Sequence, residues 1–419
     1  MQNAFGEWHP IALVALAALP LAIYLTLRAP LIFPFGAYVA LVPFDSLLML
    51  SSGATITRLV AMFAGAALLV RMIVVQRFER PGRAWFAWLA FVGYTFVSFL
   101  WTPDAETATI VFQQTLSLFL MLTILAMYPV SEREFKGMLA TLVVSGVAAA
   151  LYAVQLYRSG SVNGENRLSL STSSGLTVDP NYFATSFVLP IAFALAGAFY
   201  ARNPALRVAC IVAALVTTAG SLVSGSRGGF IAVLIVFAYF VIRSRRRLAA
   251  LGVVACGLAL TALFPSVWTR FVKDPSAAGS GSGRTFIWQT GLHSLGEHWF
   301  FGGGIGSFQS FYDRALLQTF QPVFQGWSRP SHSIVVGTLT EYGVVGLALV
   351  AYAWWSTFRQ TNAARSGRYR AVAIASEATI LGLFSQAFFL DTVFIKYYWL
   401  AYALALLVAQ LARRLDYAR

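Results

Sequence analysis

Three side chains beside apolar stretches of the sequence have the chemistry to bind or transfer a charged group. Arg227 lies in a Ser-Gly-Ser-Arg-Gly-Gly segment (224–229), Arg284 follows a segment of alternating glycine and serine (279–283), and His332 precedes a long apolar stretch. Glycines let a ligand approach the backbone, and a guanidinium offers a planar set of donors that suits phosphate. The pattern predicts a phosphate or pyrophosphate site; the alternative is arginines that reach lipid headgroups.

The segment Ser331-His332-Ser333 is placed to supply a proton acceptor. We predict that Ser331 caps a helix and that His332 lies in its first turn. The helix dipole would then lower the pKa of the imidazole and keep it neutral, as a general base requires. The alternative is an interfacial histidine without a chemical role. Arg284 opens a second predicted helix, where an anion would be attracted by both the guanidinium and the dipole.

Four further polar residues are weaker candidates. Asp179 and Asn181 precede an apolar stretch and either orient a ligand or cap a helix, and we favour capping. Arg314 and Arg329 either attract an acidic substrate or contact headgroups.

Other polar groups do not form a recognisable site. His293 and Glu297 share a helix face, but no third ligand accompanies them, so we predict no metal site and no cofactor. Glu341 lies nine residues beyond His332, about 180° around a regular helix and roughly 13 Å deeper, so it cannot orient the imidazole. Asp391 and Lys396 flank a turn and are predicted to form a local ion pair.

The elements that position these residues are membrane spans. The 419 residues are 58% hydrophobic and only 11% charged, and the mean hydropathy is +0.70. Soluble chains carry about 25% charged residues. The composition therefore predicts an all-α polytopic membrane protein. The net charge of +14 lies in short clusters between apolar stretches, which does not favour nucleic-acid binding.

Apolar stretches of sufficient length predict 12 or 13 spans. They cover residues 11–28, 31–50, 55–76, 84–101, 107–128, 137–157, 182–200, 206–224, 229–242, 248–265, 331–357, 371–390 and 397–412. We divide the chain into a transmembrane bundle (1–265), a long loop with amphipathic helices (266–330) and C-terminal transmembrane helices (331–419).

One set of connections between the spans carries 20 of the 30 basic residues, which predicts that this set faces the cytoplasm. The loops 158–181 and 266–330 then face the opposite side. Within the second loop, the stretch 284–300 mixes apolar residues with histidines and a glutamate, which predicts a helix that lies at the membrane interface. Glycines 302–304 and 306 turn the chain, and a short helix is predicted over 308–317.

Five short motifs resemble those of the O-antigen ligase superfamily, which includes O-antigen ligases, Wzy-type polymerases and pilin oligosaccharyltransferases. In chain order they are Asp-Pro-Asn-Tyr-Phe-Ala (179–184), Ser-Arg-Gly (226–228), Ser-Gly-Arg (282–284), Ser-His-Ser (331–333) and Glu-Tyr-Gly-Val-Val-Gly (341–346). Two features depart from the family's pattern. Many members have Asn where this chain has Ser333, and the ligases are usually drawn with 12 spans.

The resemblance implies a metal-independent, inverting glycosyltransferase of the GT-C type in the bacterial inner membrane, with its active site facing the periplasm. The donor would be a glycan on undecaprenyl pyrophosphate, and the acceptor of a ligase would be lipid A–core oligosaccharide. Carried onto this sequence, the family's pattern makes Arg227 and Arg284 the pyrophosphate ligands and His332 the catalytic residue. The alternatives are a polymerase or protein oligosaccharyltransferase of the same superfamily and, from another class, a lipid or polysaccharide transporter.

Overall fold

The computed structural model describes residues 10–48, 55–161, 168, 170–171, 177–243, 247–264, 283–318, 326–391, 393 and 395–417. The N-terminal helices are α1 (Pro10–Arg28), α2 (Phe35–Leu41), α3 (Ile56–Val75), α4 (Arg83–Val97), α5 (Ala105–Met127) and α6 (Glu132–Arg158). The central helices are α7 (Pro180–Thr185), α8 (Val188–Tyr200), α9 (Pro204–Val223), α10 (Arg227–Arg243) and α11 (Arg247–Ala259). The C-terminal helices are α13 (Arg284–His293), α14 (Phe308–Leu316), α15 (Ile334–Asn362), α16 (Arg370–Ala387) and α17 (Lys396–Tyr417).

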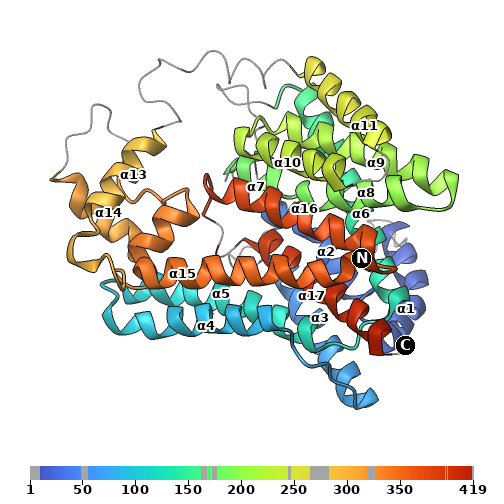
Figure 1. Ribbon diagram of the computed structural model, residues 1–419, viewed down its shortest axis with the longest axis horizontal. Coiled ribbons are helices and arrows are strands. Elements are labelled where there is room, and N and C mark those ends of the chain that lie inside the picture. The colour runs from blue at the N-terminus through green and yellow to red at the C-terminus, as the bar shows by residue number, and fades with distance from the viewer. Residues whose placement is uncertain are drawn as a thin grey trace, which may run out of the picture.

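Two-residue strands β1 (Leu170–Ser171) and β2 (Thr177–Val178) pair in antiparallel fashion within the described residues. The helices lie side by side over most of the molecule, with α13 and α14 together at one end and α1 toward the other (Figure 1). The fold is therefore built by packing of helices against one another. The long loop of the sequence contributes a separate pair of short helices.

Each predicted span contains helix, and seven helical segments of the described chain are long and apolar enough to cross a membrane. The prediction of a full span over 31–50 is wrong: α2 ends after seven residues and continues as a short 3-10 helix (Val42–Leu47). The predicted interfacial helix over 284–300 is also shorter than expected, because α13 ends at His293 and a 3-10 turn follows at Gly296–His298. Helix α14 agrees closely with the predicted helix over 308–317.

Helices α8 and α17 form the centre of the bundle, and the surrounding helices leave apolar side chains exposed. Nearly every residue of α8 is buried. By contrast, Leu59 and Met62 on α3 and Phe96 on α4 are 53%, 65% and 61% exposed. Water would not tolerate so much apolar surface, whereas lipid would. The chain is an all-α polytopic membrane protein.

Helix α15 is interrupted at Gly343, which has φ 64° and ψ −166°. The break leaves backbone groups on both sides without partners inside the helix, and the chain after α13 supplies them. The amides of Gly303 and Gly304 donate to the carbonyls of Thr340 and Glu341, both over 2.9 Å. In the other direction, the amides of Val344 and Val345 donate to the carbonyls of Trp299 and Phe300, over 3.0 and 3.2 Å.

Two glycines make this close approach possible. A Cβ atom at Gly343 would lie 2.2 Å from the carbonyl oxygen of Phe300, and one at Gly302 would lie 2.4 Å from the backbone of Glu341. Both residues also have positive φ, which glycine adopts without the steric cost that a Cβ atom brings. The triple glycine is therefore the contact surface between the long loop and the interrupted helix.

Helix α4 runs antiparallel to α15 and shows which ends of the helices belong together. The Ala84 amide at the start of α4 donates to Gln360 Oε1 near the end of α15 over 3.1 Å. At the other end of α4, the Tyr94 hydroxyl donates to the Phe301 carbonyl over 2.9 Å. We call the end that holds the start of α15 the histidine end, because His332 precedes this helix, and the opposite end the basic end.

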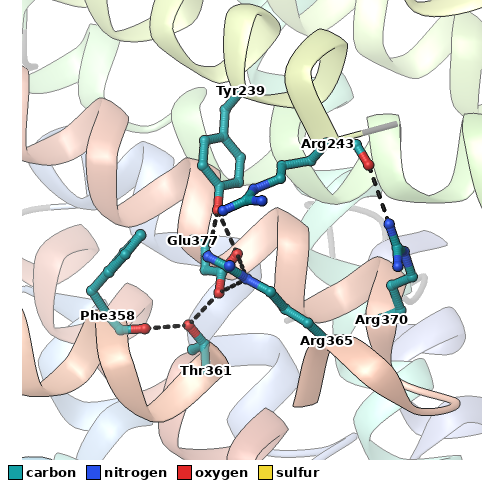
Figure 2. Close-up of polar contacts among 7 residues, drawn as sticks. All are labelled: Tyr239, Arg243, Phe358, Thr361, Arg365, Arg370 and Glu377. Atoms are coloured by element: carbon teal, nitrogen blue, oxygen red, sulfur yellow. Dashed lines mark hydrogen bonds and ion pairs between the residues drawn. The ribbon is translucent and has the colours of Figure 1, made fainter. Parts of the chain in front are cut away.

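The basic end is held together by a buried carboxylate, Glu377 on α16 (Figure 2). Arg365 Nε donates to both of its oxygens, over 2.6 and 2.7 Å. The hydroxyls of Tyr239 and Thr361 donate to the same carboxylate over 2.6 and 3.2 Å, so α10, α15 and α16 meet at one charged group. A buried charge with this many partners is stabilised, whereas removal of one partner leaves the other uncompensated.

Loops that are distant in the sequence also meet at the basic end through arginine contacts. Arg368 pairs with Glu132 at the start of α6 over 2.9 Å, and Arg414 Nε donates to Glu79 after α3 over 2.9 Å. The α3–α4, α5–α6 and α15–α16 connections and the end of α17 belong to the set predicted to carry most basic residues, and these contacts place them at one end.

We predict that Gly343→Ala destabilises the protein by about 1–3 kcal/mol or more, because alanine at positive φ is strained and its Cβ would collide with Phe300. The apparent melting temperature of the purified protein in detergent measures the effect. Gly93→Ala in α4 is the matched control, since a Cβ there meets nothing within 4 Å. Equal melting temperatures for the two variants would contradict the role assigned to the break.

We predict that Glu377→Gln destabilises the protein by about 3–5 kcal/mol, because the Arg365 guanidinium would lose its buried partner. Glu132→Gln is the control. Its partners Lys136 and Arg368 are 69% and 64% exposed, so the loss should be under about 1 kcal/mol. Thermal unfolding of both variants distinguishes the two contributions, and a larger loss for Glu132→Gln would refute the assignment.

Candidate functional site

His332 lies immediately before α15 and has a strained backbone. Its φ is +48°, in the left-handed region that residues with a side chain rarely adopt. The carbonyl of Ser333 accepts the Gly337 amide over 2.9 Å, so Ser333 rather than Ser331 occupies the capping position. The prediction that Ser331 caps the helix and that His332 lies in its first turn is therefore wrong. The left-handed turn at His332 thus comes directly before the capping residue Ser333 and the start of α15.

Contacts on both sides of His332 hold this turn. The Trp288 indole of α13 donates to the Ser331 carbonyl over 2.9 Å. The Ser331 hydroxyl lies 3.2 Å from Asp391 Oδ2 and 3.1 Å from the Ser333 carbonyl. Strain of about 1–3 kcal/mol at a single residue persists only where neighbouring contacts fix it, and such residues concentrate at functional sites.

Burial lowers the pKa of His332 from 6.5 to about 4. The positive charges of Arg284 and Arg329 lower it as well, while the Asp179 carboxylate opposes them. The direction of this shift agrees with the predicted neutral imidazole, and its causes are burial and nearby arginines rather than a helix dipole. Its Nδ1 atom is buried and has no hydrogen-bond partner within the described chain, so no carboxylate there orients the ring.

The four arginines considered in the sequence fall into different places. Arg284 begins α13 after Gly283, which has φ +73°, and both Arg284 and Arg329 act electrostatically on His332. Arg314 instead lies 5.9 Å from the Phe311 ring centroid and lines a separate groove of about 610 Å³ with His298 and Phe301. Arg329 therefore lies close enough to act on His332, whereas Arg314 lines a different part of the molecule.

Ser226, the residue before Arg227, is tied to the start of α7 by a chain of polar contacts. Asp179 caps α7 by accepting the Asn181 amide over 2.8 Å, and the Asn181 side chain donates to the same carboxylate oxygen over 2.8 Å. Asn181 Oδ1 then accepts the Ser226 hydroxyl over 2.8 Å. Ser226 also accepts the Gly229 amide over 3.1 Å, and α10 begins with Arg227. The preference for Asp179 as a capping residue is confirmed.

Helix α16 connects these two groups. Gln386 donates to the Asn181 carbonyl over 3.2 Å, and a Cβ at Gly228 would lie 3.8 Å from Phe389. The Phe389 ring lies 6.3 Å from the Trp288 ring, and Trp288 binds the Ser331 carbonyl. The starts of α7, α10, α13 and α15 therefore surround the end of α16.

A groove of about 670 Å³ adjoins this region. It lies between α10, α13, α15 and α16, and its lining is almost entirely apolar. The groove is lined by Ile231, Ile235, Trp288, Ser333, Val335, Val336, Leu381, Phe384, Ser385, Phe388 and Phe389. Because Ser333 and Trp288 belong to this lining, the groove begins next to the histidine turn.

Sequence reasoning did not assign Asp391, Trp288, Gln386 or Ser226 to the site. Lys396, which was predicted to pair with Asp391, pairs instead with Asp45 over 2.6 Å. Asp391 contacts Ser331. Among the described residues, no group of three or more His, Cys, Asp or Glu side chains lies together as a metal site would. Ser282, part of the Ser-Gly-Arg motif, lies outside the described residues.

A family model matches about a third of the chain. The model of the O-antigen ligase family, Wzy_C, matches residues 208–351, which include Arg227, Arg284, His332 and the interruption at Gly343. The match supports membership of the O-antigen ligase/Wzy superfamily, and the fold is the all-α polytopic fold expected of it. Among curated proteins there is no match.

One solved structure is also similar, from work described as "Structural coordination of polymerization and crosslinking by a peptidoglycan synthase complex". The identity is 21%, the alignment covers 78% of this chain and 96% of that chain, and the TM-score is 0.42. At this level the similarity carries no conclusion about activity.

The depressed pKa of His332 predicts a specific pH dependence of stability. Between pH about 6.5 and 4 the unfolded chain binds a proton that the folded chain does not, so stability falls as the pH falls through this window. His332→Gln should flatten this decline, as measured by melting temperatures between pH 7 and pH 4.5. His293→Gln, at an exposed position of α13, is the control. Identical pH profiles for wild type and His332→Gln would disprove the assignment.

Proposed function

We propose that the protein is an O-antigen ligase that transfers a glycan from undecaprenyl pyrophosphate to lipid A–core oligosaccharide. The reaction takes place on the periplasmic side of the inner membrane, inverts the anomeric carbon and needs no metal. The proposal rests on a half-buried histidine whose pKa is lowered by burial and by two arginines, in a chain of which residues 208–351 match the O-antigen ligase family model.

The polar residues supply the chemistry of this transfer. The acceptor hydroxyl oxygen forms a bond to the anomeric carbon, the bond from that carbon to the pyrophosphate oxygen breaks, and the hydroxyl proton passes to His332. Negative charge that develops on the departing pyrophosphate is stabilised by Arg284 and Arg227. Arg329, which also acts on His332, is placed to attract an acidic acceptor. Asp179 and Asn181 orient the start of α10 through Ser226.

The apolar groove supports a lipid-linked donor. Its lining of Ile, Val, Leu and Phe side chains suits an isoprenoid chain, and Ser333 and Trp288 bring it next to the histidine turn. A lipid that occupies this groove would hold its pyrophosphate near the starts of α10 and α13. The basic end, with its paired arginines, then faces the cytoplasm, in keeping with the positive-inside rule.

The test is transfer by purified protein supplied with a lipid-linked glycan and, in separate reactions, lipid A–core or a second lipid-linked glycan. We expect His332→Ala to abolish transfer. Arg227→Ala and Arg284→Ala should each reduce turnover at low donor concentration about tenfold or more, because each removes a charge-assisted hydrogen bond worth about 1.5–3 kcal/mol. Transfer should continue in EDTA.

Arg202→Ala is the matched control, since Arg202 is an exposed arginine that precedes α9, and the 20 residues of this helix separate it from the start of α10. Product on lipid A–core identifies a ligase, and a lengthened lipid-linked glycan identifies a polymerase and overturns the ligase assignment. Normal transfer by His332→Ala would remove the catalytic proposal. Glycan movement without any new bond would identify a transporter.

A further inference from the structure

A second charged pocket lies at the basic end, remote from His332. Its volume is about 350 Å³, and it forms where the end of α1, the end of α3 and the start of α6 meet. Four arginines line it: Arg28, Arg71, Arg77 and Arg133. Its position follows from the short connections on either side, because Arg77 directly follows α3 and Arg133 lies in the first turn of α6.

The four guanidinium groups have no hydrogen bond or ion pair within the described part of the chain. This distinguishes them from Arg365, Arg368 and Arg414 at the same end, which pair with Glu377, Glu132 and Glu79. Arg28, Arg77 and Arg133 are exposed, and Arg71 is half-buried and acts electrostatically on Tyr128. Like charges that share one pocket repel one another unless an anion offsets them.

Glu134, which also lines the pocket, has its carboxylate committed elsewhere. It accepts the Tyr128 hydroxyl over 2.6 Å and the hydroxyl and amide of Ser131 over 2.7 and 3.2 Å. These bonds form the cap of α6, whose first turn adds the positive end of a 27-residue helix to the pocket. The carboxylate therefore stabilises the helix start, and the arginines keep their charge available for a ligand.

The surroundings of the pocket are those of a lipid-binding surface. Leu25, Ile32 and Val75 line its wall, and Tyr24 at its edge is 60% exposed. Apolar side chains continue from it along both flanking helices, with Leu21 60% and Leu27 62% exposed on α1. Val74 on α3 is 71% exposed. A headgroup in the pocket would thus have its acyl chains on apolar helix faces.

We propose that this pocket binds the phosphate of an anionic phospholipid from the leaflet at the basic end. Basic pockets between transmembrane helices bind the headgroups of anionic lipids in this way, and guanidinium groups bind phosphate oxygens with two parallel hydrogen bonds. The bound lipid holds α1, α3 and the start of α6 together, because each contributes an arginine or an apolar wall. This site is independent of the transfer reaction and of its donor.

The test measures retention of phosphatidylglycerol by purified, delipidated protein, with native mass spectrometry and with the shift in melting temperature on adding the lipid. Phosphatidylcholine and inorganic phosphate are added in separate arms. We expect phosphatidylglycerol to bind and stabilise the wild type. The double variant Arg77→Gln/Arg133→Gln should bind it about tenfold more weakly. Both side chains are exposed, so the variant should fold normally, as size-exclusion chromatography will show.

Arg202→Gln/Arg247→Gln is the matched control, since it removes the same charge from exposed arginines outside the pocket and should retain the lipid. Equal losses in the two double variants would show a general attraction to basic surface and overturn the proposal. Stabilisation by inorganic phosphate equal to that by phosphatidylglycerol would also overturn it, because the lipid would then be unnecessary. Arg28→Gln is a second test, with an expected loss of about threefold.

Discussion

Four backbone hydrogen bonds across the interruption of α15 hold the long loop to the bundle. Without them, two carbonyls and two amides of a membrane-spanning helix would lack partners, at a cost of several kcal/mol each in an apolar environment. The segment from Trp299 to Gly304 satisfies all four groups, and only glycine at positions 302 and 343 leaves room for the two backbones to meet. The loop is therefore fixed by the same break that interrupts the helix.

That attachment has consequences for the histidine. Helices α13 and α14 precede and follow the attached segment in the chain, so the attachment holds both short helices to the bundle. Trp288 of α13 then binds the carbonyl of Ser331, and Arg284 acts on the imidazole. The turn at His332 is thus contacted by a helix of the long loop, which the break in α15 holds to the bundle.

The sequence predicted the class of fold and the identity of the main polar residues, because apolar length and isolated charges are local signals. It predicted Asp179 as a cap, which the structure shows, and a lowered pKa for His332, in the direction that burial and the nearby arginines shift it. The break at Gly343 was not predicted, because the backbone groups that bond across it are about 40 residues away in the sequence. A glycine in an apolar stretch is also compatible with a straight helix. Span 31–50 failed for a related reason, since its apolar composition does not show that α2 ends after about two turns.

Charge is used differently at the two ends of the molecule. At the basic end, Arg365, Arg368 and Arg414 are neutralised by carboxylates, and Glu377 joins three helices in this way. At the histidine end, burial lowers the pKa of His332, and the positive charges of Arg284 and Arg329 lower it further because they repel a protonated imidazole. The first arrangement stabilises the fold, whereas the second leaves a field that a bound anion would change.

This field couples anion binding to the basicity of His332 on the proposed function. An imidazole with a pKa of about 4 is neutral at pH 7 but is a weak proton acceptor. A pyrophosphate held by Arg284 would offset the positive charge that lowers this pKa, and by linkage the imidazole would become more basic when the donor is bound. Burial, the largest cause of the shift, would remain, so the pKa would rise without returning to 6.5. The histidine would then accept a proton most readily when donor and acceptor are both in place, and less readily in the empty site.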